Sequence, residues 1–273
     1  MKELMITLSL SFAAFFCWSQ APEGRIVYEN TSQLRIQFLN SSSVNTELEK
    51  QIPKVQIRSF ELIFGNNQSV WQQLPDARQD AEQLTQSSGN RMIFKSMIGG
   101  SKDEMTYCNF SNNRMVMSRE LNDQKYLVVD TISTNTWQLE EEYKDLLGFK
   151  AQKAKGVITT KRAVMQMENG EMIRKELPET IQVTAWFTEQ LPIPAGPVYQ
   201  GQLPGVILEL DINNGQSVYK AVEFSPKVNL AKIKEPKGGK KTTQHMYDME
   251  TRKSMEESLK RISENRRQIF NQQ

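Results

Sequence analysis

Residues Ala185 to Asp211 read AWFTEQLPIPAGPVYQGQLPGVILELD, and this stretch decides how the chain folds. An aromatic strand leads into a segment rich in proline and glycine, and an apolar strand follows. Prolines fix φ and remove backbone donors, whereas glycines adopt conformations closed to other residues. The sequence therefore predicts a rigid, ordered connection from Leu191 to Gly205 that lacks regular ladder hydrogen bonds. The residues that stiffen it are Pro192, Pro194, Gly196, Pro197, Gly201 and Gly205.

This connection has two interpretations. Ordered loops on a sheet scaffold often carry binding function, and in that case the loop forms the rim of a binding site. The candidate binding residues are then Trp186, Ile193, Tyr199, Leu203, Pro204 and Val206. Alternatively, the apolar members of the loop fold inward and cap the core. Those members are Ile193, Val198, Tyr199, Leu203 and Val206.

Runs of alternating apolar and polar residues occupy the chain on both sides of this loop. A period of two places one side-chain face on a core and the other toward water. Turn residues separate the runs at Gly65-Asn66-Asn67, Gly99-Gly100, Glu168-Asn169-Gly170 and Asn213-Asn214-Gly215. The two Asn-Gly steps lie where tight hairpins favour positive φ. The eleven predicted short strands are RIVYE (25–29), LRIQFL (34–39), VQIRSFELIF (55–64), RMIFK (91–95), MTYCNF (105–110), NRMVMSREL (113–121), KYLVVDTI (125–132), VITTKRAVMQME (157–168), TIQVTAWFT (180–188), GVILELDI (205–212) and QSVYKAVEF (216–224). They predict a mainly β fold, a curved antiparallel sheet arranged as a sandwich or a half-barrel.

Two segments depart from the strand pattern. Residues Leu74 to Ser88 are polar and rich in Gln and Ala, which predicts a short helix or an excursion over the sheet. Near the C-terminus, Thr242 to Phe270 follows a linker, KIKEPKGGKK (232–241), that we expect to be flexible. This last segment has a narrow apolar stripe at helical spacing, formed by Met255, Leu259, Ile262 and Ile269. Because so thin a stripe makes a charged helix marginal alone, we expect a basic C-terminal helix that frays or folds against a partner.

The N-terminus predicts export. An uncharged run from Leu4 to Ser19 follows Lys2 and ends in the triplet Cys17-Trp18-Ser19, a pattern typical of a secretory signal peptide. We expect cleavage near Ser19 and a periplasmic or secreted protein, with an antiparallel β domain over residues 20–226 and a linker and helix over residues 227–273. Lipidation of Cys17 is the alternative, although phenylalanines precede it where a lipid-attachment signal has small residues.

Charge is divided unevenly along the chain. The net charge is +2, yet the tail from Lys227 to Gln273 has twelve Lys and Arg against six Asp and Glu, which leaves the preceding body acidic. A basic tail outside the cytoplasm finds its acidic partner in membrane head groups, surface polymers or a protein patch, and nucleic acid is not expected there. The simpler alternative is a solvated helix face.

The residue types exclude several chemistries. His245 is the only histidine, and Cys108 is the only cysteine after the leader, so the chain offers neither a histidine-activated nucleophile nor a zinc or copper site. We expect no metal and no cofactor. The isolated Cys108 predicts a buried structural thiol. Glu209 and Asp211 share one strand face after the loop, where a solvent-facing role is favoured over a catalytic one.

Two segments resemble the GLPGLI family, a group of secreted bacterial envelope proteins whose biochemical role is largely undefined. Gly201 to Leu208 (GQLPGVIL) is similar to the segment that gives the family its name, and Trp137 to Ala154 (WQLEEEYKDLLGFKAQKA) is similar to an upstream family motif. Ala151 stands where many relatives have cysteine, so thiol chemistry does not carry over. The structural residues that the resemblance and the loop together imply are Trp137, Gly148, Gly196, Pro197, Gly201 and Gly205.

These observations favour a non-enzymatic envelope protein on a β-sheet scaffold. We expect it to bind an outer-membrane or envelope protein, or a lipid or other apolar ligand. The alternative from another class is a glycan hydrolase with two carboxylates converging in one cleft. A third interpretation is a purely structural component of envelope assembly.

Overall fold

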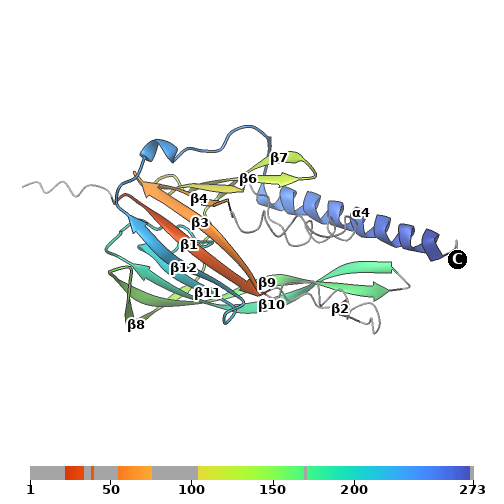
Figure 1. The fold of residues 1–273 in the computed structure, drawn as a ribbon, viewed down its shortest axis with the longest axis horizontal. Helices are drawn as coiled ribbons and strands as arrows, with labels where there is room; N and C mark the ends of the chain where they lie inside the picture. Colours follow the sequence, from red (N-terminus) through yellow and green to blue (C-terminus); the bar gives the residue numbers. More distant parts are fainter. Residues whose placement is uncertain (1–21, 34–37, 40–54, 76–103, 169–170, 271–273) are drawn as a thin grey trace, which may run out of the picture.

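The computed structural model describes residues 22–33, 38–39, 55–75, 104–168 and 171–270 (Figure 1). Its elements are β1 (Gly24–Gln33), β2 (Phe38–Leu39), β3 (Val55–Gly65), β4 (Gln68–Gln73), β5 (Met105–Asn109), β6 (Arg114–Leu121), β7 (Gln124–Thr131), β8 (Trp137–Leu146), β9 (Phe149–Glu168), β10 (Glu171–Thr188), β11 (Val206–Ile212), β12 (Ser217–Ser225), η1 (Leu230–Lys232), β13 (Lys240–Thr242) and α4 (Gln244–Phe270). Within these ranges thirteen strands form one sheet, in the order β13-β7-β6-β5-β4-β3-β1-β12-β11-β10-β9-β2, with β8 also paired to β9.

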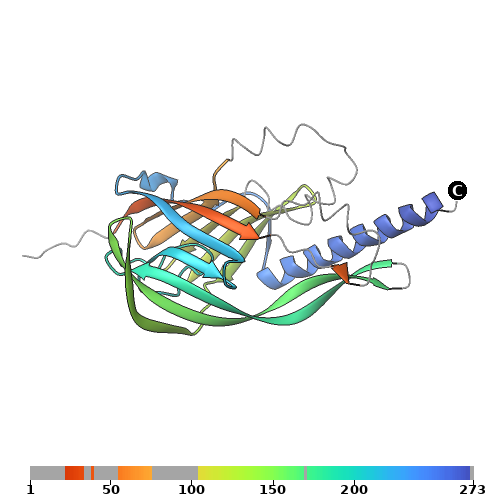
Figure 2. The same cartoon turned by 60° about the horizontal axis from the view of Figure 1, so that its bottom comes forward.

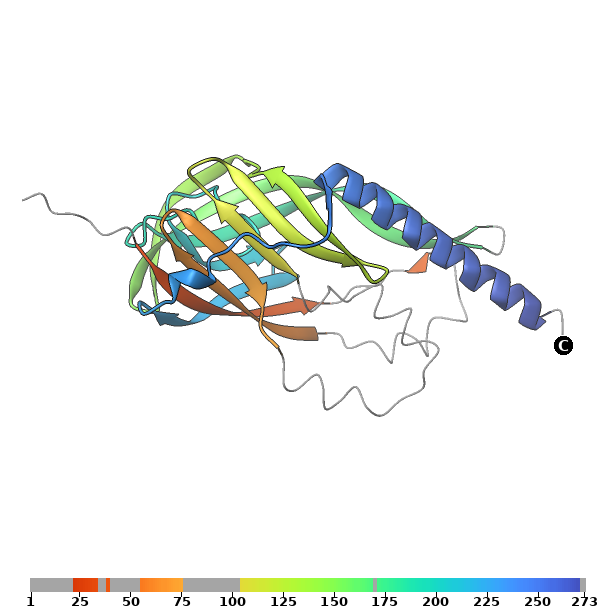
Figure 3. The ribbon, with the colours of Figure 1, turned by 90° about the horizontal axis from the view of Figure 1, so that it is seen from above.

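The predicted fold class is confirmed. The protein is mainly β, with one large open antiparallel sheet and a C-terminal helix, and parallel pairing is confined to the edge pairs β13–β7 and β2–β9. Seen from above, the strands curve around a common interior (Figure 3). Alternation produces this arrangement, because every second residue of β1 from Gly24 to Asn30 is buried while those between face outward. The described strands thus form one continuous curved sheet rather than two separate sheets.

The prediction of short strands was wrong for the hairpin of β9 and β10. These strands are 20 and 18 residues long, so the predicted strands 157–168 and 180–188 are only parts of them. They stay paired from Glu171 opposite Glu168 to Phe187 opposite Gln152. Cross-strand ion pairs support the polar part of this arm, where apolar alternation is absent; Arg162, for example, lies 3.6 Å from Glu179.

Strand β8 was not predicted, because its EEE run has no alternation. The structure accommodates that run as an irregularity in the pairing of β8 with β9 between Leu139 and Tyr143. The predicted strand 91–95 lies outside the described residues, as do residues 34–37 of another predicted strand and nearly all of the segment 74–88. The predicted turns at 65–67 and 213–215 are present, with φ near +55° at Asn66, Asn67, Asn213 and Asn214. The predicted Asn169-Gly170 step lies outside the described residues.

The C-terminal helix packs against the sheet. α4 begins two residues after the predicted start and contacts two regions from opposite ends of the strand order (Figure 2). The Tyr247 hydroxyl donates to the carbonyl oxygen of Glu120 beside the β6–β7 turn, and Arg252 forms a 3.1 Å ion pair with Glu176 of β10. Leu259, from the predicted stripe, is 4% exposed. The partner of this stretch of the helix is therefore the body of the same chain.

The linker before α4 differs from the expected flexible tether. Ile233 packs on the cluster formed by Val70, Tyr107 and Val116, and the Arg114 guanidinium lies 2.8 Å from the Glu235 carboxylate. These contacts anchor the basic segment to the outer face of the sheet.

Candidate functional site

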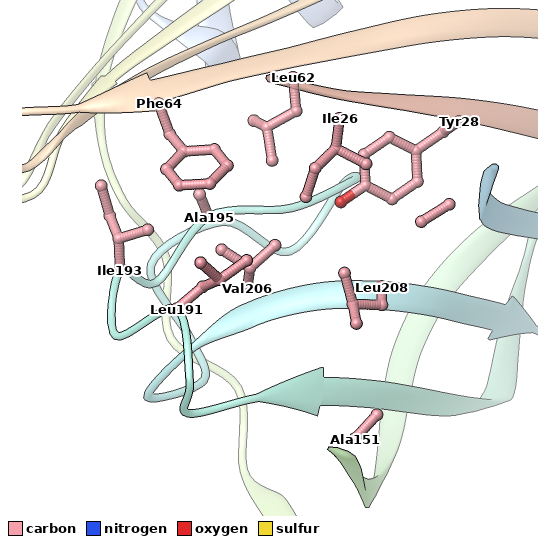
Figure 4. Close-up of a cluster of buried hydrophobic side chains, with 11 residues drawn as sticks. Ile26, Tyr28, Leu62, Phe64, Ala151, Leu191, Ile193, Ala195, Val206 and Leu208 are labelled. Atoms are coloured by element: carbon pink, nitrogen blue, oxygen red, sulfur yellow. The ribbon is translucent and has the colours of Figure 1, made fainter. Parts of the chain in front are cut away.

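The loop from Leu191 to Gly205 lies inside the curve of the sheet (Figure 4). Its residues Leu191, Ile193 and Ala195 are buried in one cluster with Tyr28 of β1 and Phe64 of β3. Burying such side chains contributes about 1.5–3 kcal/mol each. The loop therefore fills the interior that the curved sheet leaves between β1 and β11.

Hydrogen bonds fix the loop in place. The Val206 amide donates to the carbonyl oxygen of Leu191 at 3.2 Å, and the Ile207 amide donates to that of Ala195 at 2.9 Å. The Gln200 side chain accepts a hydrogen bond from Ser69 of β4. These bonds tie the loop to a strand five positions away from β10 in the sheet order.

The second family-type segment also contacts the loop. The indole Nε1 of Trp137 donates to Oε1 of Gln202 at 3.0 Å, and Asn135 donates to the same oxygen. The Tyr199 ring meets the Trp137 ring edge-on, with centroids 5.6 Å apart. The two motifs that are distant in sequence thus form one structural unit.

The glycines of the loop are required by close approach. A Cβ on Gly205 would lie 2.0 Å from the Thr188 carbonyl oxygen, and one on Gly201 would lie 2.3 Å from Ile132. Gly196 packs as tightly on Ile207, and Pro197 is buried. Gly148, by contrast, has φ +83° in the β8–β9 turn with no atom near its missing Cβ.

The structure does not gather the predicted binding residues into one site. Ile193, Leu203 and Val206 are at most 4% exposed, so these three follow the second interpretation and fold inward. Pro204 is exposed at the loop tip, as is Val198, which is 53% exposed. Tyr199 is half-buried.

Trp186 lies on the opposite face of β10 from the buried Ala185 and Phe187. The Lys144 ammonium lies 4.2 Å from the centroid of its ring and 2.7 Å from the Glu209 carboxylate. The ring is thus engaged by a cation–π contact and an adjoining ion pair, and it also packs against the edge of the cluster that contains Tyr28.

A different group of aromatic side chains gathers on the inner face, where the sheet extends beyond the loop. Phe60 of β3 stacks on Trp71 of β4 with centroids 5.1 Å apart, and Tyr219 of β12 contacts both rings. We call Phe60, Trp71 and Tyr219 the aromatic patch. All three are half-buried, whereas Tyr28, which meets Trp71 edge-on, is fully buried. The half-buried rings of the patch therefore adjoin the fully buried Tyr28 on the inner face.

Polar residues continue this inner face. Asn30 is 1% exposed, and its amide donates to the Ser217 hydroxyl at 2.9 Å and to the Val218 carbonyl oxygen. Its carbonyl oxygen accepts from Ser32 at 2.8 Å. Asn30 is thus hydrogen-bonded through both ends of its amide, as a buried polar side chain usually is.

Two neighbours on β3 are not satisfied in this way. Arg58 lies opposite Asn30 in the sheet, and Gln56 lies opposite Ser32. Among the described residues, Nε of Arg58 and Oε1 of Gln56 are buried without a hydrogen-bond partner. We call Gln56 and Arg58 the polar end of the patch. Buried polar atoms of this kind require an explanation, because leaving one unpaired costs about 1–3 kcal/mol.

The polarity of β3 is inverted beside the patch. Val55 and Ile57 are 50% and 52% exposed, while Gln56 and Arg58, which alternate with them along the strand, face the interior. From Phe60 onward the inner face is apolar in the usual way. The inner face of the strand thus changes from polar to apolar between Arg58 and Phe60.

Burial changes the pKa of two side chains near the candidate site and in the core. Burial raises the pKa of the Tyr219 hydroxyl, against the opposing effects of the Arg58 charge and a hydrogen bond with Ser217. Burial also raises the pKa of the Cys108 thiol to about 12, which confirms the prediction of a buried structural cysteine.

The carboxylates in the described ranges have roles in the sheet. Glu209 pairs with Lys144, and Asp211 accepts from the Gly215 amide at 2.6 Å in the β11–β12 turn. Wherever a carboxyl pKa is shifted in these ranges, at Glu61, Glu140, Glu235 and Glu250, the pKa is lowered.

Metal and membrane features were searched over the same part of the chain. Nowhere in it do three or more His, Cys, Asp or Glu side chains converge as metal ligands. No helix among the described residues is both long and apolar enough to span a bilayer.

One family model matches a range that contains both motifs. Residues 137–209 match the model of the family described as "Protein of unknown function (Porph_ging)". This range runs from Trp137 through the loop to Glu209, the unit described above. No curated protein matches the chain.

Solved structures support the fold. PNGF-II in a C2 crystal form superposes with a TM-score of 0.50 at 15% identity, covering 85% of this chain and 33% of that chain. Its P21 form gives a TM-score of 0.49 at 15% identity, covering 86% and 34%. The chain thus spans about a third of the length of PNGF-II. At this identity the C2 likeness concerns the fold alone.

Sequence reasoning missed the aromatic patch and its polar end. The signal was present in VQIRSFELIF, where Gln56 and Arg58 share a face with Phe60, Leu62 and Phe64. An arginine on the apolar face of a strand indicates an unfilled or functional part of the interior.

Proposed function

We propose that the protein is an exported, non-enzymatic binding protein that holds an apolar ligand against the aromatic patch. The observation that carries the proposal is the patch itself, in which side chains from β3, β4 and β12 stack on the inner face and remain half-buried. Large aromatic surfaces combined with a few polar atoms are typical of small-molecule sites.

The distribution of burial supports this assignment. The loop from Leu191 to Gly205 completes the core around Tyr28 and Phe64, which are 0% exposed. Phe60, opposite Tyr28, and Trp71, opposite Leu62, pack against this cluster and yet remain half-buried. An apolar chain laid on these rings would bury them at about 25 cal/mol per Å² of apolar surface.

The test uses decan-1-ol as a neutral apolar probe. We expect the full chain to bind it in a calorimetric titration, and to release bound lipid on organic extraction after purification. Trp71→Leu should weaken decanol binding at least tenfold, because it removes the central ring of the patch. Trp186→Leu is the matched control on the outer face and should leave the affinity unchanged.

Two results would remove the proposal. One is a folded native protein that neither binds decanol nor carries extractable lipid. The other is equal decanol affinity in Trp71→Leu and the native chain. Circular dichroism of each variant confirms that the sheet is intact, and Phe60→Leu serves as a second patch variant if Trp71→Leu does not fold.

Export and family are also part of the proposal. The leader-type residues 1–19 support secretion, and the family-model match over residues 137–209 spans both segments that resemble GLPGLI proteins. We expect N-terminal sequencing of the exported protein to begin near Gln20. Retention of the intact leader in the cytoplasm would contradict this placement.

A further inference from the structure

We infer that the ligand of the aromatic patch carries an oxyanion, which is bound by Arg58 at the polar end. This inference rests on the proposed function and specifies the chemical class of its ligand. The combination of an apolar chain and an anionic head group describes an anionic amphiphile.

Arg58 is the first observation. Its Nε is buried and has no hydrogen-bond partner among the described residues, and the residue as a whole is half-buried. A guanidinium is charged at every physiological pH and has five N–H donors in a planar fork. Burying part of a guanidinium is unfavourable unless its N–H groups are satisfied, and an anion beside Nε would offset that cost.

Polar residues close to Arg58 do have hydrogen-bond partners. On the same strand Glu61 faces outward, and its carboxylate is bound by Arg25 at 2.7 Å and by Gln72 at 2.7 Å. Across the sheet, Asn30 is satisfied by β12. Among the described residues, these polar groups are therefore satisfied, whereas Nε of Arg58 is not.

Gln56 is the second observation. Its Oε1 is buried without a donor in the described ranges, one step along the same face from Arg58. The polar end therefore offers an unused cationic donor and an unused neutral acceptor side by side. A head group with oxyanion acceptors and one hydroxyl or N–H donor satisfies both atoms.

The aromatic patch fixes the direction of the ligand. Phe60 follows Arg58 on the inner face of β3, and the Arg58 charge acts directly on the Tyr219 hydroxyl. An apolar chain that begins at Arg58 therefore passes over Phe60 and Trp71 toward the buried Tyr28. Charge and apolar surface lie in the order that an anionic amphiphile presents.

The experiment compares decanoate, decyl phosphate and decan-1-ol, which share one chain and differ in the head group. We expect the native full chain to bind at least one of the two anions about tenfold or more tightly than decanol, since hydrogen bonds to charged groups exceed neutral ones by this factor. A preference between the anions distinguishes a carboxylate from a phosphate ligand.

The Arg58→Met variant should lose this preference and bind decanol within about twofold of the native affinity. Arg58→Lys should retain part of the preference, because it keeps the charge without the fork. Lys220→Met, which removes an exposed cation from the outer face of β12 beside Tyr219, should change nothing.

The outcomes separate the two proposals. If decanol binds the native chain and the anions bind no better, or if Arg58→Met keeps the preference, the oxyanion inference is overturned while the apolar site stands. If no probe binds a folded native chain, the site itself is rejected together with the inference.

Discussion

The loop from Leu191 to Gly205 and the stretch of β3 from Gln56 to Phe60 both face the interior, yet they differ in how far their polar groups are satisfied. In the loop, Gln200 and Gln202 are bound to residues of distant strands, and the apolar side chains are packed. On β3, Oε1 of Gln56 and Nε of Arg58 lack partners in the described ranges and the adjoining rings are half-buried. The loop is packed and hydrogen-bonded like a core, whereas the β3 stretch keeps polar atoms and aromatic surface that a ligand could contact.

This difference shows that a distinctive sequence and a functional surface need not coincide. Prolines and glycines make the loop conspicuous because close approach to Thr188 and Ile132 tolerates little else. The polar end is built from ordinary strand residues, and only its position makes it unusual. We therefore assign the loop to stability and the β3 stretch to binding.

The largest expected effect is from Gly205→Ala in the loop. Its Cβ would lie 2.0 Å from the Thr188 carbonyl oxygen, so backbone must move and the free energy of unfolding should fall by more than about 4 kcal/mol. Gly148→Ala is the control, with positive φ but open space, and should cost about 1–2 kcal/mol. Urea denaturation measures both, and equal losses would refute the close-approach argument.

Ile193→Ala tests whether the loop is core. Ile193 is 2% exposed in the cluster with Tyr28 and Phe64, and its truncation should lower the free energy of unfolding by about 2–5 kcal/mol. Decanol affinity, measured below the unfolding temperature, should stay within about twofold of native. A loop rim that binds ligand would show the reverse, with weak destabilisation and a large loss of affinity.

Glu61→Gln tests a satisfied charge on the same strand as Arg58. Burial opposes ionisation of Glu61, but hydrogen bonds from Arg25 and Gln72 outweigh it and lower the carboxyl pKa. The variant should lose about 1–3 kcal/mol at pH 7.

The pH dependence of that loss follows from the sign of the shift. A lowered native pKa stabilises the fold above the unfolded value of about 4.3, and this stabilisation is lost as the pH falls through the native pKa. The stability difference between the native chain and Glu61→Gln should therefore shrink below about pH 4. A difference independent of pH down to pH 2 would show that the charge of Glu61 is not the source.

Arg58→Met should have the smallest effect on stability, with the opposite sign. Removing a half-buried guanidinium whose Nε has no partner among the described residues should leave the free energy of unfolding unchanged or raise it by up to about 1 kcal/mol. A loss of 2 kcal/mol or more in the ligand-free chain would mean that Arg58 has a structural partner, and the contrast with Glu61 would no longer hold.

Much of the fold was readable from the sequence, for identifiable reasons. Alternation gave the strands around Tyr28 and Leu62 because burial on one face imposes a period of two, and the asparagine turns followed from positive φ. The length of β9 and β10 was not readable, since their polar arm is held by cross-strand ion pairs such as Arg162–Glu179.

The candidate site was less accessible to sequence reasoning. Whether Ile193 faced solvent or core depended on which strands curve around the loop, and that is a property of the whole sheet. Trp186 was predicted as a binding residue. Because side chains alternate along β10, its ring lies on the other face from the buried Ala185 and Phe187, next to Lys144. The patch joins Phe60, Trp71 and Tyr219 across four adjacent strands, a juxtaposition that only the strand order β4-β3-β1-β12 creates.

Site-resolved NMR of the tryptophan side chains tests the central claim most directly. Trp71 belongs to the inner aromatic patch and Trp186 to the outer face, so their indole N–H signals report the two surfaces separately. On addition of decanoate to the full chain, the Trp71 signal should shift in a saturable manner while the Trp186 signal stays in place. A shift confined to Trp186, or saturable binding that leaves Trp71 unaffected, would contradict the assignment of ligand binding to the interior of the sheet.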